Sequence, residues 1–169
     1  MAMRMLEDKF VYDLADIYDA EHRFLEAQQE MLQHARAPQL QMMLQEHIAQ
    51  TQEQIQNLER IYAVLGAPPA RVTCEAAAGL VKEGQKGMQE FAANPAVRDC
   101  MISGAIAKVE HYEIASYRGL VTAFQGVGQH EILSLLSQNL NQEEQTAQKV
   151  ESSLPMLLDQ AMLARQQSA

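Results

Sequence analysis

Apolar residues recur every three or four positions along four long stretches of this chain, which is the spacing of an amphipathic helix. Glycines and prolines separate the stretches, and the apolar–polar alternation typical of strands is hard to find. Pro155 should kink or end the last stretch, because proline lacks a backbone N–H and its ring clashes with the preceding turn. The pattern predicts four helices, at about residues 6–35, 39–65, 96–124 and 129–154.

The connections between these helices are of two kinds. Residues 36–38 and 126–128 are short turns, so each should join two antiparallel helices into a hairpin. Residues 66–95 form a long crossover, in which Cys74–Val81 predicts one short extra helix. Two hairpins joined by a long crossover are the arrangement of ferritin-like proteins. We therefore expect an all-α, ferritin-like antiparallel four-helix bundle in one domain, residues 1–169.

The charge balance argues against two classes of binding partner. With 13 Lys and Arg against 22 Asp and Glu, the net charge is −9, which argues against nucleic acid or an anionic membrane as a partner. The N-terminus reaches acidic residues before any continuous apolar segment, and no stretch approaches the roughly 20 apolar residues that span a bilayer. We therefore expect a cytoplasmic protein. Cys74 and Cys100 lack zinc-ligand or CxxC spacing, and we interpret both as small buried or half-buried residues.

Four glutamates and one histidine lie on the apolar side of their helices. At about 100° per residue, Glu21 falls near the centre of the first apolar stripe, and Glu113 and Glu143 do the same in the last two helices. Glu110 lies at the edge of its stripe, and His47 lies inside the stripe of the second helix. Acidic side chains at such positions indicate a polar site within the core.

Depth along the bundle predicts which of these residues meet. Glu113 lies about 15 residues before the turn at 126–128 and Glu143 about 15 after it, so the two side chains should meet. Glu21 should pair with the level of Gln50 or Gln54 on the second helix. His47 would then be about 10 Å away from that level, at 1.5 Å per residue. The depths support the acids better than the histidine.

Carboxylates withdrawn from water cost several kcal/mol each unless something compensates their charge. An inward Lys or Arg would do so, but Arg23, Lys108 and Lys149 project to the polar side. Protonation is a second route, because crowded acids raise one another's pKa. A third route is metal: two divalent ions match four carboxylates, and oxygen ligands with an imidazole suit Fe or Mn.

The segment Lys108–Tyr117, with the sequence KVEHYEIASY, resembles the most recognisable motif of the YciE/YciF-type bacterial family of ferritin-like, stress-associated proteins. Further similarity at Cys74–Glu83, His47–Thr51 and Asn141–Glu143 extends it over the chain to about residue 155. The resemblance implies a ferritin-like fold, homodimers and a dinuclear metal centre, although the family's activity is not established. Carried onto this chain, it assigns as metal ligands Glu21, His47, Gln50, Glu110, Glu113 and Glu143.

Two features depart from what such centres usually contain. The family usually has glutamate where this chain has Gln50, which can coordinate through its carbonyl oxygen but brings no charge. Glu143 is followed by Gln145, Thr146 and Ala147, and so lacks the Glu-x-x-His pattern of di-iron carboxylate enzymes. Both departures favour metal binding over catalysis.

Two functions are open at this point. The first is a stress-response protein that binds one or two ions of Fe or Mn per chain in a structural or sequestering role. The second is a di-iron or di-manganese redox enzyme acting on peroxide or oxygen, like rubrerythrin or manganese catalase. A reductive enzyme would need an electron-donor protein, since the chain has no rubredoxin-like CxxC module. Tyr117, on the same side as Glu110, is the best candidate for a hydrogen-bond donor to the ligands.

Overall fold

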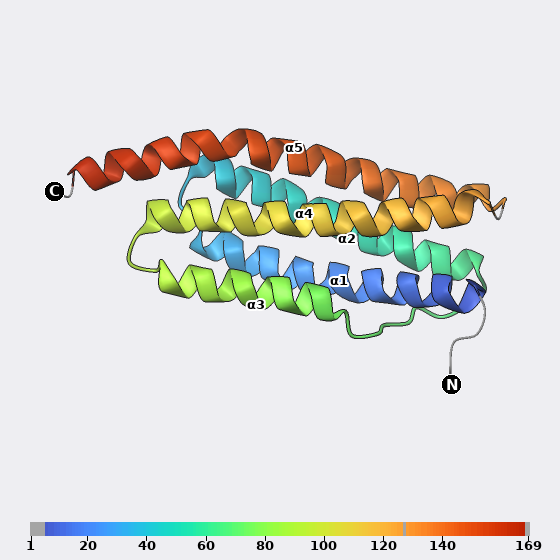
Figure 1. Cartoon of the computed structure of the whole chain (residues 1–169). Coiled ribbons are helices and arrows are strands. Elements are labelled where there is room, and N and C mark those ends of the chain that lie inside the picture. Colours follow the sequence, from blue (N-terminus) through green and yellow to red (C-terminus); the bar gives the residue numbers. More distant parts are fainter. Residues whose placement is uncertain (1–5, 127, 168–169) are drawn as a thin grey trace.

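The computed structural model describes residues 6–126 and 128–167, and within them every regular element is a helix. In chain order these are α1 (Leu6–His34), α2 (Pro38–Val64), α3 (Glu75–Glu90), α4 (Pro95–Gln125) and α5 (His130–Gln167). Figure 1 shows α1, α2, α4 and α5 as a long bundle, with α3 lying along its outside against α1 and α4. The predicted all-α, ferritin-like bundle of two hairpins and a long crossover is confirmed.

Two of the sequence predictions concern residues that the structure does not describe. Residues 1–5, where the absence of a secretory signal was expected, and Val127, in the predicted turn at 126–128, lie outside the described residues, as do residues 168 and 169. None of the described helices is both long and apolar enough to cross a membrane.

Helix boundaries follow the local chemistry. Pro38 occupies the first turn of α2, where its missing N–H costs nothing. Asn94 caps α4 by accepting a hydrogen bond from the backbone N–H of Val97 at 3.2 Å, with Pro95 next in the chain. Gly66 and Gly128 have φ of 67° and 72°, a left-handed conformation that glycine adopts without steric cost, and each follows a helix end.

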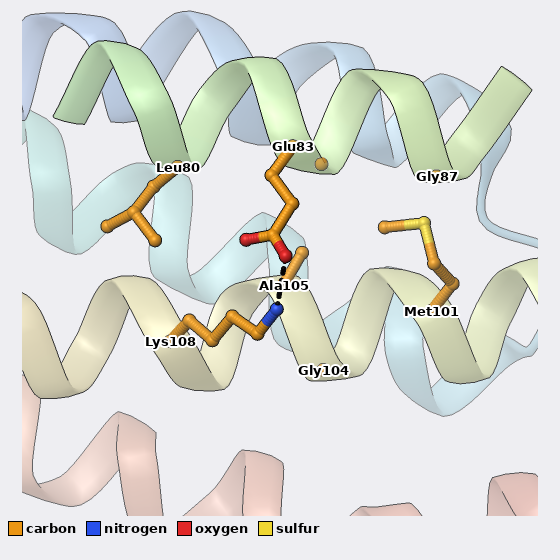
Figure 2. Close-up of a pocket in the computed structure, with 8 residues that line it drawn as sticks. Leu80, Glu83, Gly87, Met101, Gly104, Ala105 and Lys108 are labelled. Carbon is orange, nitrogen blue, oxygen red and sulfur yellow. Dashed lines mark hydrogen bonds and ion pairs between the residues drawn. The ribbon is translucent and has the colours of Figure 1, made fainter. Parts of the chain in front are cut away.

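The crossover helix is longer than the sequence predicted, because α3 runs to Glu90 rather than to about residue 81. Of the three glycines in α3, Gly87 makes the closest approach to a neighbouring helix. A Cβ atom at Gly87 would collide with the Met101 side chain of α4, which would have to move to make room for it. Figure 2 shows Gly87 facing Met101 across the groove between α3 and α4, with Glu83 and Lys108 joined by an ion pair at 2.8 Å.

Pro155 was expected to kink or end the last helix, and the predicted end at about residue 154 is wrong, since α5 continues to Gln167. Pro155 is exposed, and so is Glu151, the residue whose carbonyl the proline leaves without a helical partner. Water can therefore satisfy that carbonyl. Beyond the proline, Leu157 is buried in the core and anchors the following turns. Tertiary packing outweighs the local cost of about 3 kcal/mol for proline within a helix.

The core consists of two apolar clusters with a polar layer between them. One cluster fills the end that contains Leu14, Leu58 and Leu136, and the other fills the end that contains Leu44 and Ile102. Each bundle helix passes from one cluster to the other, and each carries buried polar side chains at the crossing. This layer consists of Glu21, Gln28, His47, Thr51, Gln54, Glu110, Glu113, Asn139, Glu143 and Thr146.

Candidate metal centre

Four residues of the polar layer bring metal-ligating atoms together. His47 of α2, Glu110 and Glu113 of α4, and Glu143 of α5 each offer one ligand atom, and these atoms all lie within 4.8 Å of one another. Glu110 and Glu113 are three residues apart, so they project from the same face of α4. All four side chains are at most 2% exposed. Three helices thus contribute to one enclosed group.

The contact of His47 with Glu110 places the imidazole beside the carboxylates. His47 Nε2 lies 3.2 Å from Glu110 Oε1 and 3.3 Å from Nε2 of Gln28. Gln28 is in turn held by Thr51, at 3.1 Å. Burial lowers the pKa of His47 from 6.5 to about 4, so its imidazole is neutral at pH 7. A neutral imidazole offers the lone pair that a metal ion requires.

Burial and mutual repulsion disfavour the charged form of these carboxylates. Burial, followed by repulsion from neighbouring carboxylates, raises the pKa of Glu21, Glu110 and Glu113 well above the ordinary glutamate value. Burial also raises the pKa of Glu143, and hydrogen bonds from neighbours such as Gln54 offset part of that shift. Among the described residues, no Lys or Arg forms an ion pair with any of these four glutamates. Nothing described near them supplies positive charge.

Many oxygens of this group lack a hydrogen-bond donor. Both carboxylate oxygens of Glu110 and of Glu113 have none, nor do Oε2 of Glu143 and Oε2 of Glu21. Contacts between the acids become hydrogen bonds only where one acid of a pair is protonated. The group therefore needs either protons or cations, because buried polar atoms without partners are costly.

Glu21 adjoins this group but is not one of the four residues whose ligand atoms lie together. It is fully buried beside Glu113, and its Oε1 accepts a hydrogen bond from Tyr117 OH. Tyr117, predicted to donate a hydrogen bond to one of the ligands, thus donates to Glu21, the predicted ligand on α1. Glu21 is close enough to share the charge of the cluster without contributing to its set of four ligand atoms.

The structure brings together most of the predicted ligands, but not Gln50. That side chain is half-buried, and its Oε1 accepts a hydrogen bond from Thr146 at 3.0 Å. Gln54, one helical turn further on, donates instead to Oε1 of Glu143, while its own carbonyl oxygen has no donor. A ligand role for Gln50 stays a prediction without geometric support. In the sequence, Gln54 was one of the two residues of the second helix expected at the depth of Glu21.

The histidine's depth was estimated well and interpreted wrongly. His47 pairs with Gln28, seven residues beyond Glu21, which matches the expected offset of about 10 Å. The offset does not exclude His47, because Glu110 is fully buried rather than at the edge of its stripe, and it reaches the histidine.

These residues fit a divalent cation of the Fe or Mn kind. Carboxylate oxygens with one neutral imidazole are ligands that these ions accept, and the unpartnered oxygens of Glu110 and Glu113 are already desolvated. A cation would also supply the positive charge that nothing described near the cluster provides. A cavity that borders His47 between α1 and α4 has a volume of about 10 Å³, room for about one water molecule. Only very small molecules could reach His47 through this cavity.

Comparisons with known proteins agree with this fold. Over residues 5–163 the chain matches the family described as Domain of unknown function (DUF892). It is 31% identical over 147 residues to the protein YciF of Escherichia coli strain K12, covering 86% of this chain and 88% of that protein. The resemblance seen in the sequence is confirmed.

Solved structures show the same likeness. YcfI from Rhodopseudomonas palustris is 34% identical, with a TM-score of 0.85 over 88% of this chain and 94% of that one. The crystal structure of the E. coli stress protein YciF gives a TM-score of 0.87 at 28% identity, over 93% of this chain and 99% of that one. A protein from Xanthomonas campestris pv. campestris, at 22% identity and a TM-score of 0.72, covers 95% of this chain and 97% of that one, and shows the fold alone.

Proposed function

Because this chain belongs to the DUF892 family and holds a buried histidine–carboxylate cluster, we propose that it is a metal-binding stress-response protein. Its ligands are His47, Glu110, Glu113 and Glu143, and they bind a divalent cation, Fe or Mn, in a structural or sequestering role. The association with stress rests on the relative named the E. coli stress protein YciF.

One observation carries this proposal: four carboxylates are buried in the core without a described lysine or arginine beside them. Isolated buried carboxylates cost several kcal/mol each even after relaxation. A bound cation removes this cost and supplies Lewis acidity at the site. The protein's own contribution is to hold the carboxylate oxygens close together and to exclude water from them.

A structural role follows from where the ligands come from. His47, Glu110 and Glu143 belong to three different helices, so a shared cation would link α2, α4 and α5 at the centre of the bundle. Metal binding of this kind adds directly to the free energy of unfolding. The cavity of about 10 Å³ beside His47 leaves no room for a substrate larger than a few atoms.

The same small cavity is compatible with a second function, a redox reaction with peroxide or oxygen. Both oxidants are small and neutral, and the cavity that borders His47 is lined mainly by apolar residues, among them Phe24, Met31 and Ile106. A pair of iron or manganese ions, when bound, would supply the electrons, and a reductive cycle would draw on an electron-donor protein. Here the chain's residues would hold the ions, exclude water and admit only the oxidant.

The assembly and location that we propose are a homodimer in the cytoplasm. The exposed apolar side chains Leu158, Met162 and Leu163, on the last turns of α5, support an interface between copies.

Anaerobic reconstitution with Fe(II) or Mn(II), followed by hydrogen peroxide, separates the two functions. For the structural role, we expect the melting temperature to rise on loading and peroxide to remain unconsumed. Consumption over many turnovers would favour the redox enzyme. A chain that binds neither ion and melts at the same temperature would contradict both.

A further inference from the structure

A directed chain of hydrogen bonds crosses the bundle and ends on Glu21. Asn57 of α2 donates to Asn139 of α5 at 2.8 Å, and Asn139 donates to the hydroxyl of Tyr117 on α4 at 3.0 Å. Tyr117 OH then donates to Oε1 of Glu21 on α1. Each of the four bundle helices supplies one member, and all four side chains are at most 4% exposed.

These hydrogen bonds leave the Tyr117 hydroxyl only one acceptor to which it can donate, the carboxylate of Glu21. Asn139 Nδ2 faces two acceptors, the Tyr117 hydroxyl and the backbone carbonyl of Gln54 at 3.3 Å, while its Oδ1 faces the amide of Asn57. This arrangement fixes the orientation of the Asn139 carboxamide. A phenol has one hydrogen, so a hydroxyl that accepts from Asn139 donates its own hydrogen to Glu21.

Oε1 of Glu21 therefore accepts the hydrogen bond from Tyr117. Glu21 is not one of the four residues whose ligand atoms lie together. A hydrogen bond from a phenol to a carboxylate is charge-assisted, and the low local dielectric strengthens it. Dinuclear carboxylate centres in this type of bundle use about six side chains, four acids and two histidines. This chain places four ligand atoms together, and Tyr117 holds the next acid at their edge.

We propose that Tyr117 is a positioning residue that occupies Oε1 of Glu21, withholds that oxygen from the four-residue group and so limits the centre to one divalent cation per chain. This inference rests on the proposed metal-binding function. Without the hydroxyl, Oε1 of Glu21 is free to coordinate beside Glu113, which Glu21 already contacts, and a second cation gains a ligand.

The test compares Tyr117→Phe with Tyr112→Phe by counting Mn(II) ions. The first substitution keeps the ring and removes the hydroxyl that bonds to Glu21. The second is the control, because the Tyr112 hydroxyl bonds to Asp16 at 3.0 Å, outside the cluster. Each chain is loaded anaerobically with excess Mn(II), dialysed and analysed for metal content. Electron paramagnetic resonance then reports whether ions are spin-coupled in pairs.

We expect one Mn(II) per chain for the wild type and for Tyr112→Phe. For Tyr117→Phe we expect two coupled ions, with the second binding about tenfold more tightly than in the wild type, because an additional charged ligand oxygen tightens cation binding. Adding Glu21→Gln to Tyr117→Phe should return the count to one. One ion in Tyr117→Phe, or two equally tight ions in the wild type, would overturn the inference.

Glu21→Gln alone keeps the test decisive even where Tyr117→Phe fails to fold. It should leave the first Mn(II) bound as tightly as in the wild type, whereas loss of that ion would make Glu21 one of its ligands and overturn the inference. A wild-type chain that binds no Mn(II) removes the proposed function itself. If Mn(II) binds but at a stoichiometry other than the expected one, only the proposed role of Tyr117 is contradicted.

Discussion

Gln54 donates its side-chain amide to Oε1 of Glu143, so an uncharged residue of α2 contacts a buried carboxylate of α5 at the centre of the bundle. The carbonyl oxygen of the same amide is buried and has no donor. Rotation of the amide would offer that oxygen to a cation beside Glu143. The contact therefore identifies Gln54, rather than Gln50, as the amide of α2 that adjoins the centre.

Replacing Gln54 by Glu should tighten metal binding by about tenfold, because it adds a negative charge next to Glu143. The same change should lower the melting temperature of the metal-free protein, since it buries one more acid. Gln50→Glu is the matched control: its side chain is half-buried and bonded to Thr146, so the affinity should change by less than about threefold. Calorimetric titration with Mn(II) measures both. A larger gain for Gln50→Glu would place the ligand one turn earlier.

Removing one ligand charge should weaken metal binding without removing the fold. Glu113→Gln keeps the shape of the side chain, and its loss as a ligand should lower Mn(II) affinity by at least about tenfold. Glu144→Gln is the control, because Glu144 is 42% exposed and pairs with Arg118 at 2.6 Å. Metal content after dialysis measures the effect. Equal occupancy in both variants would remove Glu113 from the ligand set.

The metal-free protein should lose stability as the pH rises from 7 to 8.5. Burial raises the pKa of Glu21, Glu110 and Glu113 in the folded state, so that state binds more protons than the unfolded one above the ordinary value of 4.5. The resulting stability is present at low pH and is lost as the pH rises through the folded-state pKa values. Glu113→Gln should flatten the trend, and thermal melts in chelator would show it.

The window begins at pH 7 because His47 acts in the opposite direction below it. Burial lowers the pKa of His47 to about 4, so its contribution to stability is lost as the pH falls below the ordinary value of 6.5. The metal-loaded protein should not destabilise between pH 7 and 8.5, because cations replace the protons. Parallel slopes for the loaded and metal-free forms would mean that no cation binds these acids.

The close approach of α3 to α4 can be tested with two glycines. Gly104→Ala adds a methyl group where nothing lies within 4 Å, so the better helix propensity should raise the free energy of unfolding by about 1 kcal/mol. Gly87→Ala should lack this gain because its Cβ would collide with Met101. Urea unfolding compares the two variants. Equal stabilisation of both would mean that α3 packs less closely than described.

The sequence revealed the buried acids because a charge on an apolar stripe is conspicuous. Counting residues from the turn then placed Glu113 opposite Glu143 correctly, since a short hairpin fixes the relative depth of its two helices. Gln54 gave no comparable signal, because a neutral amide on that stripe costs less and is common. Choosing between Gln50 and Gln54 requires the register of α2 against α5, and no short connection joins these helices.

The other differences arise where packing overrides a local rule. Pro155 is a helix breaker by its chemistry, but the burial of Leu157 holds the next turns in place. Glycines are unfavourable within a helix, but Gly87 of α3 leaves room for the Met101 side chain of α4. Both outcomes depend on partners that are distant in the sequence. Local patterns therefore predicted the four bundle helices better than they predicted where α3 and α5 end.

Elemental analysis of the protein, purified without chelators or an affinity tag and then reconstituted anaerobically with Fe(II) or Mn(II), tests the central claim most directly. We predict at least one ion per chain, and a melting temperature that falls when the ion is removed. A chain that remains metal-free, with an unchanged melting temperature, would contradict the claim and leave Glu21, Glu110, Glu113 and Glu143 as a protonated, hydrogen-bonded core.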